Sequence, residues 1–331
     1  MSARGHGSVV VYCTVLLLLT AVLWGLGLGV GSSGWHNPFA AWQDAIDRQI
    51  LLDIRAPRTI GAWLVGALLG LSGAVAQGLF RNPLAEPYLL GSSSGATLAL
   101  AVVLSLSGQS VWATSIAWHV GLTGVAFVGA LGGVALTLFM ARGASHTMRL
   151  LLSGVVVGVV LGAFTSLMTV WSAELWRTMQ SFMLGNTGLL SWTSCGVLLG
   201  TWALTLPMAL VLARVLDALT LGEETARSLG IPLGWARAAL VLVLALSAGA
   251  AVAQSGLIAF VGLAAPHLVR RHTQTRHVGL LLAASLMGGV VLLGADVLAR
   301  WVIAPQELPV GVVTAVLGGT YLLWLMHRRA A

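Results

Sequence analysis

The chain has 331 residues, of which 58% are hydrophobic and only 8% are charged, and its mean hydropathy is +0.94. Because soluble domains carry about 25% charged residues, this composition excludes a water-soluble fold and predicts an integral membrane protein. All 17 basic residues are arginine, and the formal net charge is +7. The lack of lysine excludes a P-loop, whose lysine must reach the nucleotide phosphates, and no cluster of basic and aromatic residues suggests binding to nucleic acid.

Apolar runs of about 20 residues have the length that a helix needs to cross a bilayer. The sequence predicts an all-α polytopic fold, with a single transmembrane domain over residues 1–331 and no soluble domain. The short, glycine-rich eighth run is expected to be partly buried or broken, and the first is too long for a signal peptide. The ten predicted spans lie near 8–31, 58–80, 89–107, 113–141, 149–171, 192–214, 234–254, 257–269, 278–301 and 310–326.

The distribution of arginines predicts the orientation of these spans. With the N-terminus inside, twelve arginines fall on the cytoplasmic side, in agreement with the positive-inside rule. Ten spans then place both termini in the cytoplasm. Cys13 and Cys195 fall near opposite faces, so no disulfide is expected. The five arginines expected outside are Arg48, Arg55, Arg58, Arg177 and Arg300.

Small residues at four-residue spacing predict close contacts between helices. There is also a weak sign of an inverted repeat, because Ala-Val-Ala-Gln occurs both at 74–77 and at 251–254, on opposite faces of the membrane. The small-residue pairs are Gly66/Gly70, Gly129/Gly133 and Gly154/Gly158.

The segment 81–96 interrupts two apolar runs with Pro83, Pro87, an amide, two opposite charges and several small residues. Backbone groups freed by proline cannot face lipid unpaired, so this segment is expected to be buried in protein or to line water. A solute pathway or a gate has this property. Gly91 to Gly95 also fits the G-x-S-x-G pattern of serine hydrolases, but flanking membrane helices favour close packing instead.

The polar segment 216–235 predicts a short helix outside the bilayer on the cytoplasmic side. Thr220 and Glu223 form a candidate capping box, and Glu223 and Glu224 place negative charge in the first turn. Gly230 is expected in the left-handed conformation, and Pro232 prevents continuation of the helix. The segment is either a surface connector or a docking element for a partner, with its leucines available: Leu219, Leu221 and Leu229.

Several charged residues and one histidine have more than one interpretation. Arg55, Arg58 and Arg300 either anchor helix ends at headgroups or receive carboxylates of a partner. Asp296 is the acid embedded most deeply in the membrane, and it is expected to pair with Arg300 one turn later. His267 could ligate haem or a metal ion, but a hydrogen bond to a loop or a contact with a partner is favoured.

Four segments resemble those of the FecCD-type permeases, which are membrane subunits of ABC importers for vitamin B12, haem and ferric siderophores. The resemblance covers the chain from about residue 50 to its end. The four segments are Arg81 to Ala96, Glu224-Thr-Ala226 with Gly230, Gly262-Leu-Ala-Ala-Pro-His267 and Glu307 to Gly318.

The resemblance implies a homodimeric type II importer permease in the bacterial inner membrane. Two cytoplasmic ABC ATPase subunits would bind ATP and Mg²⁺, and one periplasmic binding protein would deliver the cargo. This chain would be no enzyme and would bind no cofactor or metal ion itself.

The resemblance also assigns roles to residues. The cytoplasmic gate would consist of Asn82 and Leu84 together with Thr147 and Met148. Arg55, Arg58 and Arg300 would receive glutamates of the binding protein. Residues that would couple the chain to the ATPase, over about 218–230, are Leu219, Leu221, Glu223, Glu224, Ala226, Arg227 and Gly230.

The cargo pathway would be lined by the fifth and tenth helices, and Val160, Phe164 and Met168 are candidate residues on the fifth. These side chains suit a flat apolar cargo, but they equally suit helix packing. The resemblance is somewhat closer to haem permeases, so haem is the first candidate, with vitamin B12 or a ferric siderophore as the alternative.

Two other classes of protein remain as alternatives. An ion-coupled secondary transporter needs buried carboxylates, for which Asp296 is the single candidate. An intramembrane serine protease needs a serine and a histidine that face each other, and the nearest pair, Ser92–Ser94 with His119, is expected at opposite ends of its helices.

Overall fold

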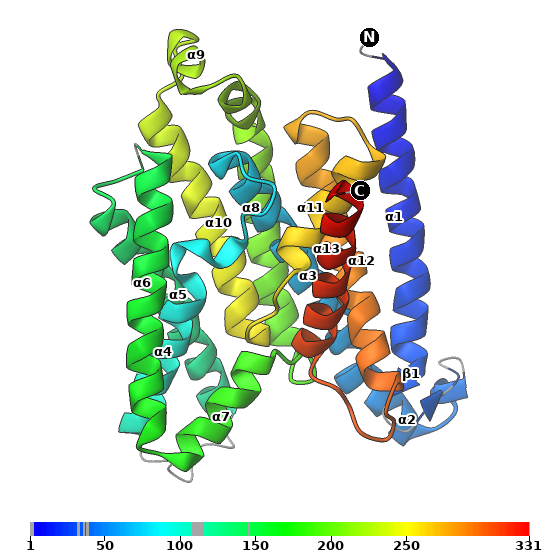
Figure 1. The fold of residues 1–331 in the computed structure, drawn as a ribbon. Helices are drawn as coiled ribbons and strands as arrows, with labels where there is room; N and C mark the ends of the chain where they lie inside the picture. The colour runs from blue at the N-terminus through cyan, green and yellow to red at the C-terminus, as the bar shows by residue number, and fades with distance from the viewer. Residues whose placement is uncertain are drawn as a thin grey trace.

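The computed structural model describes residues 3–31, 34–35, 37, 40–107, 116–144 and 146–330. They form an all-α fold with one two-stranded antiparallel ribbon, β1 (Val30–Gly31) and β2 (Gly34–Trp35) (Figure 1). Three short helical turns, η1 (Ala40–Trp42), η2 (Leu51–Arg55) and η3 (Pro87–Leu90), join longer elements. The α-helices are α1 (Ala3–Gly29), α2 (Ala45–Ile50), α3 (Ala56–Phe80), α4 (Ser92–Leu106), α5 (Ile116–Met140), α6 (Thr147–Val170), α7 (Ala173–Leu184), α8 (Trp192–Thr220), α9 (Glu223–Ser228), α10 (Leu233–Ser255), α11 (Val261–His272), α12 (His277–Trp301) and α13 (Val310–Ala330).

Each of the ten expected spans coincides with a helix, although the bounds differ by several residues. Among the described residues, seven helical stretches are long and apolar enough to cross a membrane, and the two apolar stretches Ser92–Leu106 and Val310–Trp324 are shorter. The eighth expected span became the 12-residue α11, which is largely buried, as its length and glycines had indicated. The sixth continues to Thr220 in spite of Pro207 inside it.

α7 was not expected as a helix, because the polar stretch that contains it lacks a long apolar run. Ser172 provides its N-cap by accepting a hydrogen bond from the Leu175 backbone N–H, and Glu174 lies in its first turn. One face buries Leu175 and Met179. An amphipathic helix of this length can be stabilised by packing alone, without spanning the bilayer.

α3 lies at the centre of the fold, and every one of its residues except Ile60 is buried. α8, α10, α11 and α12 pack against it. The closest approach is to α12, because a Cβ atom on Gly66 or Gly70 would overlap the backbone of Gly288 or Ala284. Gly129 and Gly133 of α5 meet Gly95 of α4 in the same manner, which confirms the expectation of close packing for these pairs.

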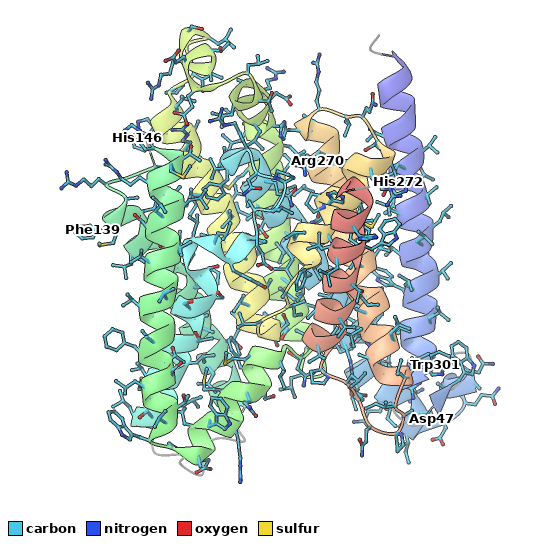
Figure 2. All side chains as sticks on the ribbon, viewed as in Figure 1. Asp47, Phe139, His146, Arg270, His272 and Trp301 are labelled. Atoms are coloured by element: carbon cyan, nitrogen blue, oxygen red, sulfur yellow. The ribbon has the colours of Figure 1, made fainter. Side chains whose placement is uncertain are left out.

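The two ends of the molecule carry different elements (Figure 1). The N-terminus and α9 lie at one end, called here the α9 end. α2, β1 and α7 lie towards the opposite end, called here the α2 end. Figure 2 places His146 and Arg270 in the half nearer α9, whereas Asp47 and Trp301 lie at the α2 end. Cys13 and Cys195 are free thiols, as expected.

Candidate gate and coupling site

The turn between α8 and α10 carries the short helix α9 at the extreme of the α9 end (Figure 1). The expected capping box is wrong: Thr220 remains in α8, where its hydroxyl donates to the Asp217 carbonyl over 2.6 Å. The N-cap is instead Gly222, at φ +105°. Gly230 does adopt the left-handed conformation, at φ +79°, as its position after the helix had indicated.

The residues predicted to couple this turn to an ATPase divide into an exposed and a buried set. Leu219 and Ala226 are 1% and 0% exposed, so the expectation that Leu219 is available to a partner is wrong. Leu219 belongs to α8 and packs into the core that also holds Ala226. Of the predicted residues, Glu223 is partly buried, and the exposed ones are Leu221, Glu224, Arg227 and Gly230, together with Leu229.

Glu223 of α9 joins three other elements through its carboxylate. The Arg237 guanidinium at the start of α10 lies 2.6 Å from Glu223 Oε1, and its side chain is 1% exposed. The Thr147 hydroxyl at the start of α6 donates to the same oxygen over 3.2 Å. Arg81, which ends α3, approaches it to 4.0 Å. The first residue of α9 therefore holds the beginnings of α6 and α10 and the end of α3 together.

Two of these contacts lie beside the residues predicted to form the gate. Thr147 precedes Met148, and Arg81 precedes Asn82. The Asn82 side chain accepts a hydrogen bond from the Leu84 backbone N–H over 2.9 Å, which closes a tight turn. Leu84 and Met148 are 58% and 69% exposed, so within one chain these two apolar side chains remain uncovered.

The charge of Glu223 depends on these neighbours. Burial raises the pKa of the carboxyl, but Arg237, Thr147 and Arg81 outweigh burial, so the pKa of Glu223 lies below its usual value. A carboxyl with a depressed pKa stabilises the folded state above its unfolded pKa of about 4.3, and this stabilisation disappears as the pH falls through the folded pKa.

We expect Glu223→Gln to lower the free energy of unfolding by roughly 1–3 kcal/mol at neutral pH, because Arg237 would lose its charged partner. The difference from the wild type should shrink as the pH falls below about 4. Thermal unfolding in detergent at several pH values would measure both effects. Glu224→Gln is the matched control one residue later, where the side chain is exposed. If the stability of the two variants depended on pH in the same way, this would contradict the role assigned to the ion pair of Glu223 with Arg237.

A second charged cluster lies near the α2 end, around Asp296 of α12. This carboxylate is fully buried and pairs with Arg300 one turn later, as expected. It also accepts hydrogen bonds from Arg58 of α3, over 3.1 and 3.2 Å, and from the Thr187 hydroxyl over 2.6 Å. Arg58 makes a further ion pair of 2.7 Å with Glu307.

These ion pairs change what can be expected of the three docking arginines. Arg58 and Arg300 are 8% and 1% exposed and engage Asp296, so neither faces a partner as it stands. Arg55 is half-buried and donates to the carbonyls of Leu28 and Gly29, both over 3.2 Å. A docking role for Arg58 or Arg300 would require the pairs with Asp296 to open.

The predicted pathway residues of α6 do not all lie on one open surface. Val160 and Phe164 are 46% and 54% exposed. Met168 is partly buried and packs against a cluster that includes Leu175 and Met179.

His267, the candidate ligand of haem or a metal ion, lies edge-on to the Tyr321 ring, with 5.9 Å between ring centroids. In the described part of the chain, no three His, Cys, Asp or Glu side chains gather as a metal site.

Sequence reasoning missed Arg237, Thr187 and the contact between Arg58 and Asp296. Arg58 and Asp296 are 238 positions apart, so no local pattern links them. A signal did exist for Arg237, since an arginine inside an apolar span is costly unless it is paired. The nearest acids along the chain are Glu223 and Glu224.

The chain matches one protein family and two curated permeases over nearly its whole length. The profile of the FecCD transport family matches residues 16–328. The hemin transport system permease protein HmuU of Yersinia pestis is 36% identical over 333 residues, which is 99% of this chain and 98% of HmuU. The vitamin B12 import system permease protein BtuC of Salmonella paratyphi A is 39% identical over 319 residues, covering 95% of this chain and 94% of BtuC.

Two solved structures share the fold. One is described as an inward-facing conformation of a putative metal-chelate type ABC transporter, and it is 28% identical with a TM-score of 0.84 over 96% of this chain and 98% of its own. The other is PsaBC from Streptococcus pneumoniae in complex with Fab, at 15% identity and a TM-score of 0.58 over 86% of this chain and 92% of its own. The second shows similarity of fold alone.

Proposed function

The chain belongs to the FecCD transport family, and from that premise we propose that it is the permease subunit of an ABC importer for a bulky metal chelate. The observation that carries the proposal is the family match over residues 16–328, combined with a solvent-exposed turn, α9, bound to the predicted gate elements. ATP hydrolysis belongs to a separate ATPase subunit, because the chain has no lysine with which to build a P-loop.

The contacts of Glu223 suggest how an ATPase acts on the gate. Two copies of the chain would lie in the bacterial inner membrane. Two cytoplasmic ATPase subunits would bind their α9 turns through Leu221 and Leu229. Their closure on ATP would move α9, and Glu223 would transmit the movement to Thr147 and Arg81. Both residues adjoin the gate residues, so the pathway would switch between outward-facing and inward-facing states. One periplasmic binding protein would deliver cargo at the α2 end, with Arg55 as a candidate contact, and both termini would be cytoplasmic.

The cargo is proposed to be a bulky metal chelate, with haem as the first candidate and vitamin B12 or a ferric siderophore as the alternative. A hemin permease and vitamin B12 permeases resemble the chain at 36% and 39% identity, respectively. Exposed Val160 and Phe164 of α6 offer apolar surface to such a cargo. The pathway should hold its cargo weakly and leave tight binding to the binding protein, since cargo must also leave.

An ion-coupled secondary transporter is less well supported. Such a transporter needs a buried carboxylate that gains and loses its ion partner during transport. Asp296 is instead engaged by two arginines and the Thr187 hydroxyl. Compensated in this way, it suits a structural role.

We expect uptake into vesicles that contain the chain, its ATPase and its binding protein to require ATP. Haemin, cobalamin and a ferric siderophore would be offered in parallel, each with the binding protein, and ATP replaced by ADP serves as the control. Accumulation of haemin alone would support the cargo assignment, and accumulation of cobalamin alone would contradict it. Uptake driven by a proton gradient without ATP would contradict the proposed function itself.

A further inference from the structure

Two interruptions of the helical bundle meet inside the fold. The first break, residues 81–91, separates α3 from α4, and the second break, residues 256–260, separates α10 from α11. Each follows within four residues of an Ala-Val-Ala-Gln sequence, at 74–77 and 251–254. α3 and α10 pack against each other. The paired breaks give structural support to the weak sequence sign of an inverted repeat.

Three consecutive residues of the first break contact the second break or the helix after it. The Glu86 carboxylate accepts a hydrogen bond from the Phe260 backbone N–H over 3.3 Å. The Tyr88 hydroxyl donates to the Ile258 carbonyl over 3.1 Å. Between them, Pro87 lies so close to Gly262 that a Cβ atom there would overlap the proline ring. These contacts are called the junction below.

The junction satisfies backbone groups that no helix serves. Phe260 is the N-cap of α11 and has φ +68°, a conformation that costs energy in a residue other than glycine. Its N–H lies outside the helical hydrogen-bond ladder, so the Glu86 carboxylate provides its acceptor. A negative group there also suits the positive end of the helix dipole. The junction therefore stabilises the backbone conformation of the second break.

The second break in turn contacts two helices beyond the junction. The Leu257 backbone N–H donates to the Phe182 carbonyl of α7 over 3.0 Å. The Phe260 side chain lies directly against Gly318 of α13, and a Cβ atom on Gly318 would overlap it. α7 and α13 are therefore connected through the second break to the segment that carries Asn82 and Leu84.

Open space borders the junction on one side. A pocket of about 540 Å³ lies between the first break, the end of α7 and α13. Glu86 and Tyr88 of the first break and Val312 and Val316 of α13 are among the residues that line it. Because this pocket separates part of α13 from the first break, the junction and the contact of Phe260 with Gly318 are what connect the two elements.

We propose that Glu86 and Tyr88 are positioning residues that couple the predicted gate at Asn82 and Leu84 to α7 and α13. A displacement of the first break at the α9 end is carried by the junction to the second break and from there to both helices. The inference rests on the proposed function, because it assigns a mechanical role within that transport cycle.

The test uses the assembled complex of the chain with its ATPase and reports on the gate directly. Leu84→Cys is introduced as a reporter into a Cys13→Ala, Cys195→Ala background, and its reaction with a membrane-impermeant maleimide is timed with and without ATP. The parent should react at rates that differ with ATP. Glu86→Ala and Tyr88→Phe should each reduce this ATP-dependent difference, by about tenfold for Glu86→Ala, because the partly buried Phe260 N–H would lose its acceptor.

Controls separate a loss of coupling from a loss of folding. Glu86→Gln keeps an oxygen acceptor and should retain most of the ATP-dependent difference. Glu174→Ala makes the same side-chain change at an exposed position of α7 and should behave as the parent. Each variant should co-purify with the ATPase and elute at the position of the parent complex in size-exclusion chromatography, which an unfolded chain would not do.

The outcomes distinguish the inference from the proposed function. A parent whose labelling ignores ATP overturns the proposed function and the inference with it. A parent that responds to ATP, with Glu86→Ala and Tyr88→Phe responding equally well, overturns the inference alone. If Glu86→Ala does not assemble, Tyr88→Phe decides by the same criterion, since it removes one hydroxyl and keeps the ring.

Discussion

The double change Leu221→Asp and Leu229→Asp is expected to abolish co-purification of the chain with its ATPase. These side chains are 65% and 62% exposed on the α9 turn and are the large apolar groups that it presents. Burying each leucine in a partner's cleft contributes about 1.5–3 kcal/mol, so losing both would weaken the complex by roughly 10²-fold to 10⁴-fold. Pull-down of the ATPase by the tagged chain, followed by size-exclusion chromatography, would measure the loss.

The fold itself should tolerate this change, because both side chains already face solvent. Leu106→Asp is the matched control, since this leucine is 81% exposed as the last residue of α4. Deleting residues 220–230 is a harsher test of the same idea, but it also removes the buried Ala226 and the ion pair of Glu223. Recovery of an intact complex with the double variant would contradict the coupling assignment.

Asp296→Ala is expected to lower the free energy of unfolding by about 3–5 kcal/mol, because it leaves Arg58 and Arg300 buried without their shared partner. The Thr187 hydroxyl would lose its acceptor as well. Thermal unfolding of the purified chain in detergent would reveal the loss as a lower midpoint. Asp53→Ala is the control, since Asp53 is exposed on η2, which directly follows α2 at the same end of the molecule. A loss below about 1 kcal/mol would show that the cluster is not a stabilising element.

The same cluster decides how docking of the binding protein can be tested. Arg58→Glu would place a second carboxylate beside Asp296, so weaker docking in that variant could reflect unfolding. Arg55→Glu disturbs two hydrogen bonds to backbone carbonyls and leaves the Asp296 cluster intact. Docking affinity should therefore be compared between Arg55→Glu and the wild type, and an unchanged affinity would argue against Arg55 as a contact.

Much of the fold follows from local patterns in the sequence. A helix of about 20 apolar residues needs no partner to satisfy its backbone, so the ten runs predict ten helices whatever surrounds them. Paired glycines such as Gly66 and Gly70 likewise predict where two backbones meet. Failures arose where tertiary packing competed with a local signal. Thr220 has the sequence of a helix start, yet continued packing of α8 kept it helical and moved the N-cap to Gly222.

The candidate site was predictable only in part, because its parts come from distant segments. The proline-rich break and the α9 turn were each visible along the chain, and Gly230 behaved as its position required. Their connection through Glu223 and Arg81 was not visible, nor was the contact of Glu223 with Thr147, which lies 76 positions earlier, because no local pattern specifies either pairing. For Arg58, a local signal was present but misleading. Its position at the start of a helix suggested an exposed side chain, whereas the side chain is buried in an ion pair with Asp296.

The glycine seam, where Gly66 and Gly70 of α3 meet the backbone of α12, determines which part of the molecule stays rigid while other helices move. Backbone touches backbone along this seam, so the two helices cannot slide past each other without a collision. By contrast, only five of the 24 residues of α6 are buried within one chain. If α9 drives the transport cycle, the outer helices would move relative to a rigid pair formed by α3 and α12. Substitutions that stiffen this pair further should therefore leave the range of that movement almost unchanged.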